Sequence, residues 1–206
     1  MWKRVLLSLL YPSLLVILSI RLAFSEPFVE FLYSRIELPP DPMSYEVRLS
    51  IAKLGLRSVL SEEGMREFVQ SGLFNQREIK HMEDVKSLLS LFFTFLYIAL
   101  PFWFFIFLRL RGWKERGMVL ISGGLLLEGF ALFVLFASIV SYEWIFEAFH
   151  NLFFDPYSWR FREEDMLLRV YPMDFWFWAT VYTALGVFIV NASLQALGFL
   201  LWRKSV

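Results

Sequence analysis

The run SLLSLFFTFLYIALPFWFFIFL, residues Ser87–Leu108, carries no charged side chain and decides the fold class. A helix needs about 20 mostly apolar residues to cross a bilayer, so this run predicts a membrane-spanning helix. Three further runs have the same character, namely Val5–Phe24, Met118–Val140 and Asp174–Trp202. The sequence therefore predicts an all-α integral membrane protein, with four transmembrane helices in a single membrane domain over residues 1–206.

The composition supports this class and excludes several others. Hydrophobic residues make up 58% of the 206 residues, and Phe alone occurs 24 times, whereas a soluble domain is nearer half apolar. The zero net charge argues against nucleic acid as a partner. The lack of cysteine excludes disulfides, thiolate nucleophiles and Cys-based metal sites. The sequence has no nucleophile elbow, phosphate-binding glycine loop or dinucleotide fingerprint, so serine-hydrolase and nucleotide-driven chemistry have no support.

Basic residues predict the orientation, because short cytoplasmic segments are rich in lysine and arginine. Basic residues lie near both termini and in the connection between the second and third runs. They are Lys3, Arg4, Arg109, Arg111, Lys114, Arg116, Arg203 and Lys204. Both termini are therefore predicted to be cytoplasmic. Residues 25–86 then form a helical extracytoplasmic segment, and residues 141–173 form an interfacial extracytoplasmic one. The first run is interpreted as a span and not as a cleaved signal peptide, because its apolar stretch is long and Arg21 interrupts the approach to the cleavage site.

The segment between the first two spans has helical patterns of its own. Residues 43–60 and 61–70 predict two helices, and Asn75 opens a third. Asn75 and Glu78 form a capping-box pattern, in which each side chain binds the backbone N–H of the other. No breaker follows before Pro101, so this third helix should continue into the second span.

The only two histidines, His81 and His150, flank apolar runs on the expected outer side. Few other groups exchange protons near neutral pH, so their shared side indicates a site. Asp84 follows His81 by three residues, so it can hold the ring and raise its basicity. The alternative is an exposed helix face with local ion pairs to Lys80 and Lys86. His150 lies in an aromatic stretch typical of a helix in the membrane plane, where a satisfied interfacial histidine is the alternative.

Two histidines and a carboxylate can hold zinc, so Asp84, Asp155 or Asp165 could complete a metal site, although no zinc-like spacing such as H-x-x-x-H occurs. Arg21, near the outer end of the first span, is expected to reach lipid phosphate or to steer a substrate headgroup.

Glu128 is unusual because it lies inside the third span. Asn191 in the fourth span falls at similar depth, so we predict a buried hydrogen bond that joins the two helices, with Glu128 protonated. Gly123 and Gly124 would permit the close approach that this bond needs.

Two segments resemble a known family. The first is LFNQREIKHMEDVKSLL, which contains an N-x-x-E-x-x-H-M-x-D-V pattern formed by Asn75, Glu78, His81, Met82, Asp84 and Val85. The second is FHNLFFDPYSWRFREEDMLLRVYP, whose matching residues are Phe149, His150, Phe153, Phe154, Trp159, Asp165 and Pro172. Within a four-span layout, these segments resemble the bacterial lipoprotein intramolecular transacylases, called Lit.

The resemblance implies an acyltransferase of the bacterial cytoplasmic membrane whose site faces outward. Its substrate would be a lipoprotein whose N-terminal cysteine carries a diacylglyceryl group. The sn-2 acyl chain would move to the cysteine α-amine and leave a lyso-form lipoprotein, with lipid as the other partner. Ester to amide is downhill, so no cofactor and no metal are expected.

The resemblance also implies that His81 and His150 are catalytic, one as base toward the amine and the other assisting the oxyanion and the leaving oxygen. Asp84 favours His81 as the base. Supporting positions are Asn75, Glu78, Trp159, Asp165 and Arg21. Two alternatives stay open. They are a metal-dependent membrane lipid hydrolase that uses the same histidines, and a non-enzymatic scaffold or transporter subunit built on Glu128 and Asn191.

Overall fold

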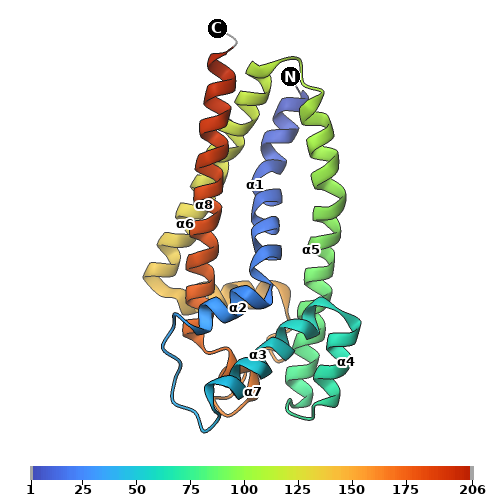
Figure 1. The fold of residues 1–206 in the computed structure, drawn as a ribbon, viewed down its shortest axis with the longest axis vertical. Coiled ribbons are helices and arrows are strands. Elements are labelled where there is room, and N and C mark those ends of the chain that lie inside the picture. Colours follow the sequence, from blue (N-terminus) through green and yellow to red (C-terminus); the bar gives the residue numbers. More distant parts are fainter. Residues whose placement is uncertain (1, 205–206) are drawn as a thin grey trace. The chain divides into compact units, whose positions relative to one another are not determined.

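The computed structural model describes residues 2–204, which are helical apart from the connecting segments (Figure 1). Four long helices alternate with shorter ones. In chain order the helices are α1 (Trp2–Ala23), α2 (Glu26–Tyr33), α3 (Tyr45–Leu60), α4 (Glu62–Gln70), α5 (Gln76–Leu108), α6 (Trp113–Phe153), α7 (Met166–Val170) and α8 (Met173–Arg203).

The four long helices, α1, α5, α6 and α8, are each long and apolar enough to cross a membrane. The predicted all-α class with four candidate spans is therefore confirmed. Only 11% of the most apolar 18-residue stretch of α5 is buried inside the protein. Large side chains such as Ile98, Phe136 and Ile139 face outward. Such an extensive exposed apolar surface is expected where helices face lipid.

The chain forms two compact units. We call the first the bundle unit, formed within Met1–Arg21, Phe93–Ala137 and Val181–Val206. The second comprises Leu22–Phe92 and Ser138–Thr180. It contains both histidines, and we call it the histidine unit. The helices α5, α6 and α8 each contribute residues to both units.

Within the bundle unit, the buried side chain of Asn191 on α8 links α1 and α6 through hydrogen bonds, and we call this group the polar centre. The Tyr11 hydroxyl donates to Asn191 Oδ1 at 2.9 Å, and Asn191 Nδ2 donates to Glu128 Oε1 and to the Gly124 carbonyl, each at 3.2 Å. The predicted bond between Glu128 and Asn191 is thus confirmed. A Cβ at Gly123 would lie 2.8 Å from the Tyr11 side chain, so glycine is needed for this approach.

The histidine unit is held together by contacts between α3 and the chain around α7. Arg48 is buried, and its guanidinium donates to the carbonyls of Pro39 and Arg169. The Asp41 carboxylate accepts from Arg169 Nε and Nη2, both at 2.9 Å. These hydrogen bonds lower the pKa of Asp41 to about 2, so the pair stays charged near neutral pH. The Tyr171 hydroxyl donates to the Ala52 carbonyl on α3.

The helices follow the predicted pattern, apart from two short ones. α3 and α4 match the helices predicted over 43–60 and 61–70, and α5 continues without a break into the predicted second span. α6 is interrupted at Ser141, where φ is −162° and ψ is 97°, so residues 142–153 form a separate helical stretch. This agrees with the predicted end of the third apolar run at Val140. The short helices α2 and α7 were not predicted, because they have too few turns for a periodic pattern.

Candidate active site

The structure brings His81 and His150 side by side. Their ring centroids are 5.8 Å apart, and the ring planes differ by 27°. His81 lies in the second turn of α5, and His150 lies in the last turn of α6. The two histidines therefore form one cluster within the histidine unit, although 68 residues separate them in the chain.

Aromatic side chains surround the two imidazoles. Phe154 and Phe161 meet His81 edge-on at centroid distances of 5.0 and 5.4 Å, and Trp159 lies 4.9 Å from His150. Edge-to-face packing of this kind is the preferred geometry for aromatic rings. The rings that contact one or both histidines are Phe146, Phe149, Phe154, Trp159 and Phe161. The two imidazoles are therefore packed among these five aromatic rings, and we call this cluster of side chains the aromatic chamber.

Both histidines lie beyond the parts of α5 and α6 that are suited to cross a membrane. All the charged side chains of α5 fall in its first three turns, around His81, and the apolar run starts after them. In α6, the break at Ser141 precedes His150 by more than two helical turns. Both titratable rings therefore lie outside the apolar runs of α5 and α6.

Burial keeps both imidazoles neutral near pH 7. It lowers the pKa of His81 to about 4, with a smaller contribution from the charge on His150 that outweighs the opposite effect of Asp84. Burial also lowers the pKa of His150, against the effect of its hydrogen bond to the Phe146 carbonyl. A neutral imidazole can accept a proton or donate one hydrogen bond, as an acid–base site requires.

The hydrogen bonds of the two rings differ. His150 Nδ1 lies 2.7 Å from the Phe146 carbonyl oxygen. Because a carbonyl can only accept, Nδ1 carries the hydrogen and the lone pair of the neutral ring is on Nε2. His81 Nδ1 is buried and has no hydrogen-bond partner.

Of the two interpretations of the His81–Asp84 spacing, the structure shows the local ion pair and no hydrogen bond between Asp84 and His81. Asp84 Oδ1 accepts from Lys80 Nζ at 2.7 Å, one turn away on the exposed side of the helix. Lys80 competes successfully because its flexible side chain reaches the carboxylate without leaving water. The alternative of a local ion pair on a helix face is therefore the one observed for Asp84.

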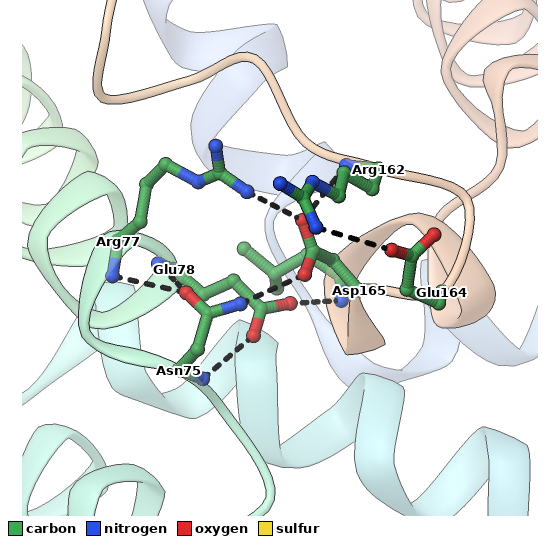
Figure 2. Close-up of polar contacts among 7 residues, drawn as sticks. Asn75, Arg77, Glu78, Arg162, Glu164 and Asp165 are labelled. Atoms are coloured by element: carbon green, nitrogen blue, oxygen red, sulfur yellow. Dashed lines mark hydrogen bonds and ion pairs between the residues drawn. The ribbon is translucent and has the colours of Figure 1, made fainter.

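Glu78 connects the start of α5 to α7 (Figure 2). Its Oε2 accepts from Asn75 N at 2.8 Å, and Asn75 Oδ1 accepts from Glu78 N at 3.1 Å, so the predicted capping box is confirmed. Its Oε1 accepts from Leu167 N at 2.7 Å. The carboxyl is fully buried, and burial raises its pKa although these two backbone hydrogen bonds oppose the rise. Glu78 thus satisfies one backbone N–H in each of two segments.

Asp165 adds a second connection beside the first (Figure 2). Its carboxylate accepts from Asn75 Nδ2 at 2.8 Å, from Arg77 Nη2 at 2.9 Å and from Arg162 N at 2.7 Å. The Arg77 guanidinium also lies over the Phe161 ring, 5.8 Å from its centroid. The loop that carries Phe161 is therefore fixed to the first turn of α5, one turn before His81.

The remaining predicted site residues lie in other environments. Arg21 belongs to the bundle unit, where its Nε donates to the Tyr97 hydroxyl at 2.9 Å and its guanidinium covers the Phe93 ring. These contacts hold Nε and one face of the guanidinium, and the expected reach of Arg21 to lipid phosphate stays a prediction. Asp155 accepts from Tyr157 N at 2.8 Å and closes a turn. Within residues 2–204, no three His, Asp or Glu side chains are placed to hold a metal ion.

Four contributors to the site were not identified from the sequence: the Phe146 carbonyl, Phe161, Arg77 and the Leu167 N–H. Phe146 precedes His150 by four residues, so helical spacing could have identified that contact. Phe161, Arg77 and Leu167 depend on how a loop returns to α5, for which the chain has no local signal.

Comparison with known proteins supports this architecture. The family model described as lipoprotein intramolecular transacylase Lit matches residues 5–176. A relative from Aquifex aeolicus (strain VF5), described as an uncharacterized protein, is 41% identical over 203 residues, which cover 95% of this chain and 92% of that protein.

Two solved structures share the fold. The membrane integral lipoprotein intramolecular transacylase Lit from Bacillus cereus aligns with a TM-score of 0.72 and 18% identity, covering 99% of this chain and 96% of that one. A variant of that protein with a histidine-to-arginine mutation aligns with a TM-score of 0.64 and 17% identity, covering 99% and 92%. Because the family model matches most of its length, this chain belongs to the lipoprotein intramolecular transacylase (Lit) family.

Proposed function

We propose that this protein moves the sn-2 acyl chain of a diacylglyceryl lipoprotein from its glycerol ester to the α-amine of the same N-terminal cysteine. The product is a lyso-form lipoprotein with an N-acyl group. The observation that carries the proposal is the pair of neutral imidazoles, 5.8 Å apart in an aromatic chamber, in a chain of the Lit family.

The bond changes and proton transfers of the reaction need no group beyond those of the substrate and the two imidazoles. The α-amine attacks the ester carbonyl carbon, a C–N bond forms, and the π electrons move to the carbonyl oxygen. When the tetrahedral intermediate collapses, the C–O bond to the glycerol breaks. The proton lost by the amine balances the proton gained by the glycerol oxygen.

We assign the base to His150. Its Nδ1–H is held by the Phe146 carbonyl, so the Nε2 lone pair is available to take the proton from the amine. His81 then assists the departing glycerol oxygen through its unpartnered Nδ1. This assignment reverses the preference for His81 that was based on Asp84, since Asp84 pairs with Lys80.

Positioning contributes more to this reaction than proton transfer. General acid–base assistance is worth about 10²–10⁴ in rate, whereas holding the amine beside the ester can lower the barrier by roughly 7–11 kcal/mol. The aromatic chamber suits that task because its rings are packed against one another and its loop is fixed by Glu78 and Asp165.

We also propose the topology. Both termini are cytoplasmic, and the site faces the opposite, extracytoplasmic side, as the basic residues around the termini and after α5 favour. The spans are about residues 5–24, 87–108, 118–140 and 174–202. The outward-facing segments are residues 25–86 and 141–173.

Mass spectrometry of a lipoprotein tests the proposal. The protein is expressed in a bacterium that lacks such an enzyme, and the N-terminal lipopeptide of an abundant lipoprotein is analysed. We expect one acyl chain on nitrogen and one on glycerol, and a rate of transfer lower by about 10²–10⁴ with His81→Ala or His150→Ala. Unchanged diacylglyceryl peptide from well-expressed protein would refute the proposal. Release of free fatty acid that stops on chelation would support a metal-dependent hydrolase instead.

A further inference from the structure

We propose that Trp159 is a further catalytic residue, whose indole N–H donates a hydrogen bond to the ester carbonyl oxygen as that oxygen becomes negative. This role rests on the proposed acyl transfer. It supplies the oxyanion donor for which neither histidine is free, since one takes the amine proton and the other faces the leaving oxygen.

The first observation is a buried donor without an acceptor. Trp159 is only 7% exposed, and its Nε1 has no hydrogen-bond partner. A buried indole N–H usually finds a partner, because leaving it unpaired is unfavourable. Within residues 2–204, four buried side-chain atoms lack a partner, and two of them, Trp159 Nε1 and His81 Nδ1, belong to the aromatic chamber. A bound acyl ester would bring acceptors to this region.

The second observation is the place of the indole beside the base. The Trp159 ring centroid lies 4.9 Å from that of His150, with the planes inclined by 41°. The amine that His150 deprotonates is bonded to the carbonyl carbon in the intermediate, so the oxyanion is only one bond from that carbon. A donor next to the base is therefore within reach of the oxygen where charge develops.

The third observation is that the indole is held before any substrate binds. The Phe146 ring packs edge-on against it at 6.2 Å, and the Arg160 guanidinium lies over its face at 5.2 Å from the centroid. A donor fixed in advance needs no reorganisation during the reaction, which is the condition for effective oxyanion stabilisation.

The indole keeps its proton throughout. As the amine nitrogen attacks, the carbonyl electrons move to oxygen and the N–H of Trp159 shares its hydrogen with that oxygen. When the electrons return, the glycerol C–O bond breaks and the hydrogen bond weakens. Trp159 therefore changes the barrier and leaves the proton balance between amine, histidines and glycerol unchanged.

Replacement of the N–H alone tests this role. Trp159→Phe removes the donor, and incorporation of 3-benzothienylalanine at position 159 keeps the indole shape with sulfur in place of N–H. For both variants we expect kcat to fall by about 10²–10³, the usual loss for one oxyanion donor, with KM and the pH profile little changed. Trp144→Phe is the matched control, because Trp144 is 61% exposed and lies outside the chamber.

The outcomes separate the donor role from packing and from the reaction itself. Full activity of the benzothienylalanine protein would overturn the donor role, including the case in which Trp159→Phe alone is inactive. A raised KM with unchanged kcat would overturn it as well, since the contact would then act on substrate binding. If the wild-type protein makes no N-acyl lipopeptide, the proposed function fails and the role of Trp159 fails with it, whereas a fully active benzothienylalanine variant of an active protein overturns the role of Trp159 alone.

Discussion

A backbone carbonyl gives His150 its orientation, because Phe146 accepts the Nδ1 hydrogen and leaves Nε2 as the only basic atom of the ring. Carboxylates often have this task in other histidine sites. A carbonyl is neutral, so it orients the ring without adding a nearby negative charge. The imidazole therefore stays unprotonated in its buried position, as a base must before it acts.

The pH dependence of the reaction should follow the substrate and not the histidines. The pKa of His81 is lowered to about 4 and that of His150 is also lowered, so both rings are neutral above pH 6.5. An α-amine has a pKa of about 7.7–8 and cannot attack while protonated. We expect the rate to rise with pH up to this range and then level off. A midpoint near 6.5, the ordinary value for histidine, would contradict the lowered pKa values.

Single-residue features were partly predictable. Two histidines at the ends of apolar runs pointed to the candidate site, because so few groups of this type occur in the chain, and the structure places their rings side by side. Their partners could not be predicted in the same way. Asp84 has the right spacing for a contact with His81, yet its carboxylate accepts from Lys80 instead. The position of Trp159 beside His150 depends on how residues 154–165 fold back, which is a tertiary property.

At the level of elements, Glu78 joins the first turn of α5 to α7. Its two carboxylate oxygens each accept one backbone N–H, and a glutamine has only one oxygen to offer. Glu78→Gln should therefore leave one buried donor unpaired and lower the free energy of unfolding by about 1–3 kcal/mol. Thermal denaturation in detergent measures this change. Glu83→Gln, on the exposed side of the same helix, is the control, and an equal loss there would argue against the role of the connection.

A substitution in the polar centre of the bundle unit distinguishes an enzyme from a transporter subunit. Glu128→Gln keeps an oxygen that can accept from Asn191, so the helices should stay joined. We expect transacylation to change by less than about tenfold, which corresponds to about 1.4 kcal/mol in the barrier. His81→Ala should lower the rate by about 10²–10⁴. Lipopeptide formation in membranes measures both, and the opposite order of effects would favour a transport function.

The elements themselves were predicted as far as periodic signals reach. Long apolar runs predicted the four long helices, and the capping box at Asn75 predicted where α5 starts. The break in α6 at Ser141 agrees with the predicted end of the third apolar run at Val140, where the aromatic stretch around His150 begins. α2 and α7 are stabilised by tertiary contacts, which local propensity does not contain.

At the level of the whole molecule, the lack of cysteine makes the proposed topology directly testable. A single Tyr157→Cys substitution places a thiol at a position that is 87% exposed. A membrane-impermeant maleimide should label it in intact spheroplasts. Lys114→Cys, in the basic connection before α6, should react only after permeabilisation. Labelling of Lys114→Cys in intact spheroplasts would contradict cytoplasmic termini.

The contacts of Arg48 have a consequence for biosynthesis. One of the carbonyls that accept from its guanidinium belongs to a residue 121 positions later, and the Asp41–Arg169 pair spans 128 positions. At roughly 5–20 residues per second, a ribosome needs about 6–24 s to make that interval. The nascent chain must therefore tolerate an Asp41 carboxylate without its arginine partner and an open face of α3 while its later half is still being translated. Protection of this segment from protease should begin only after the residues of α7 have left the insertion machinery.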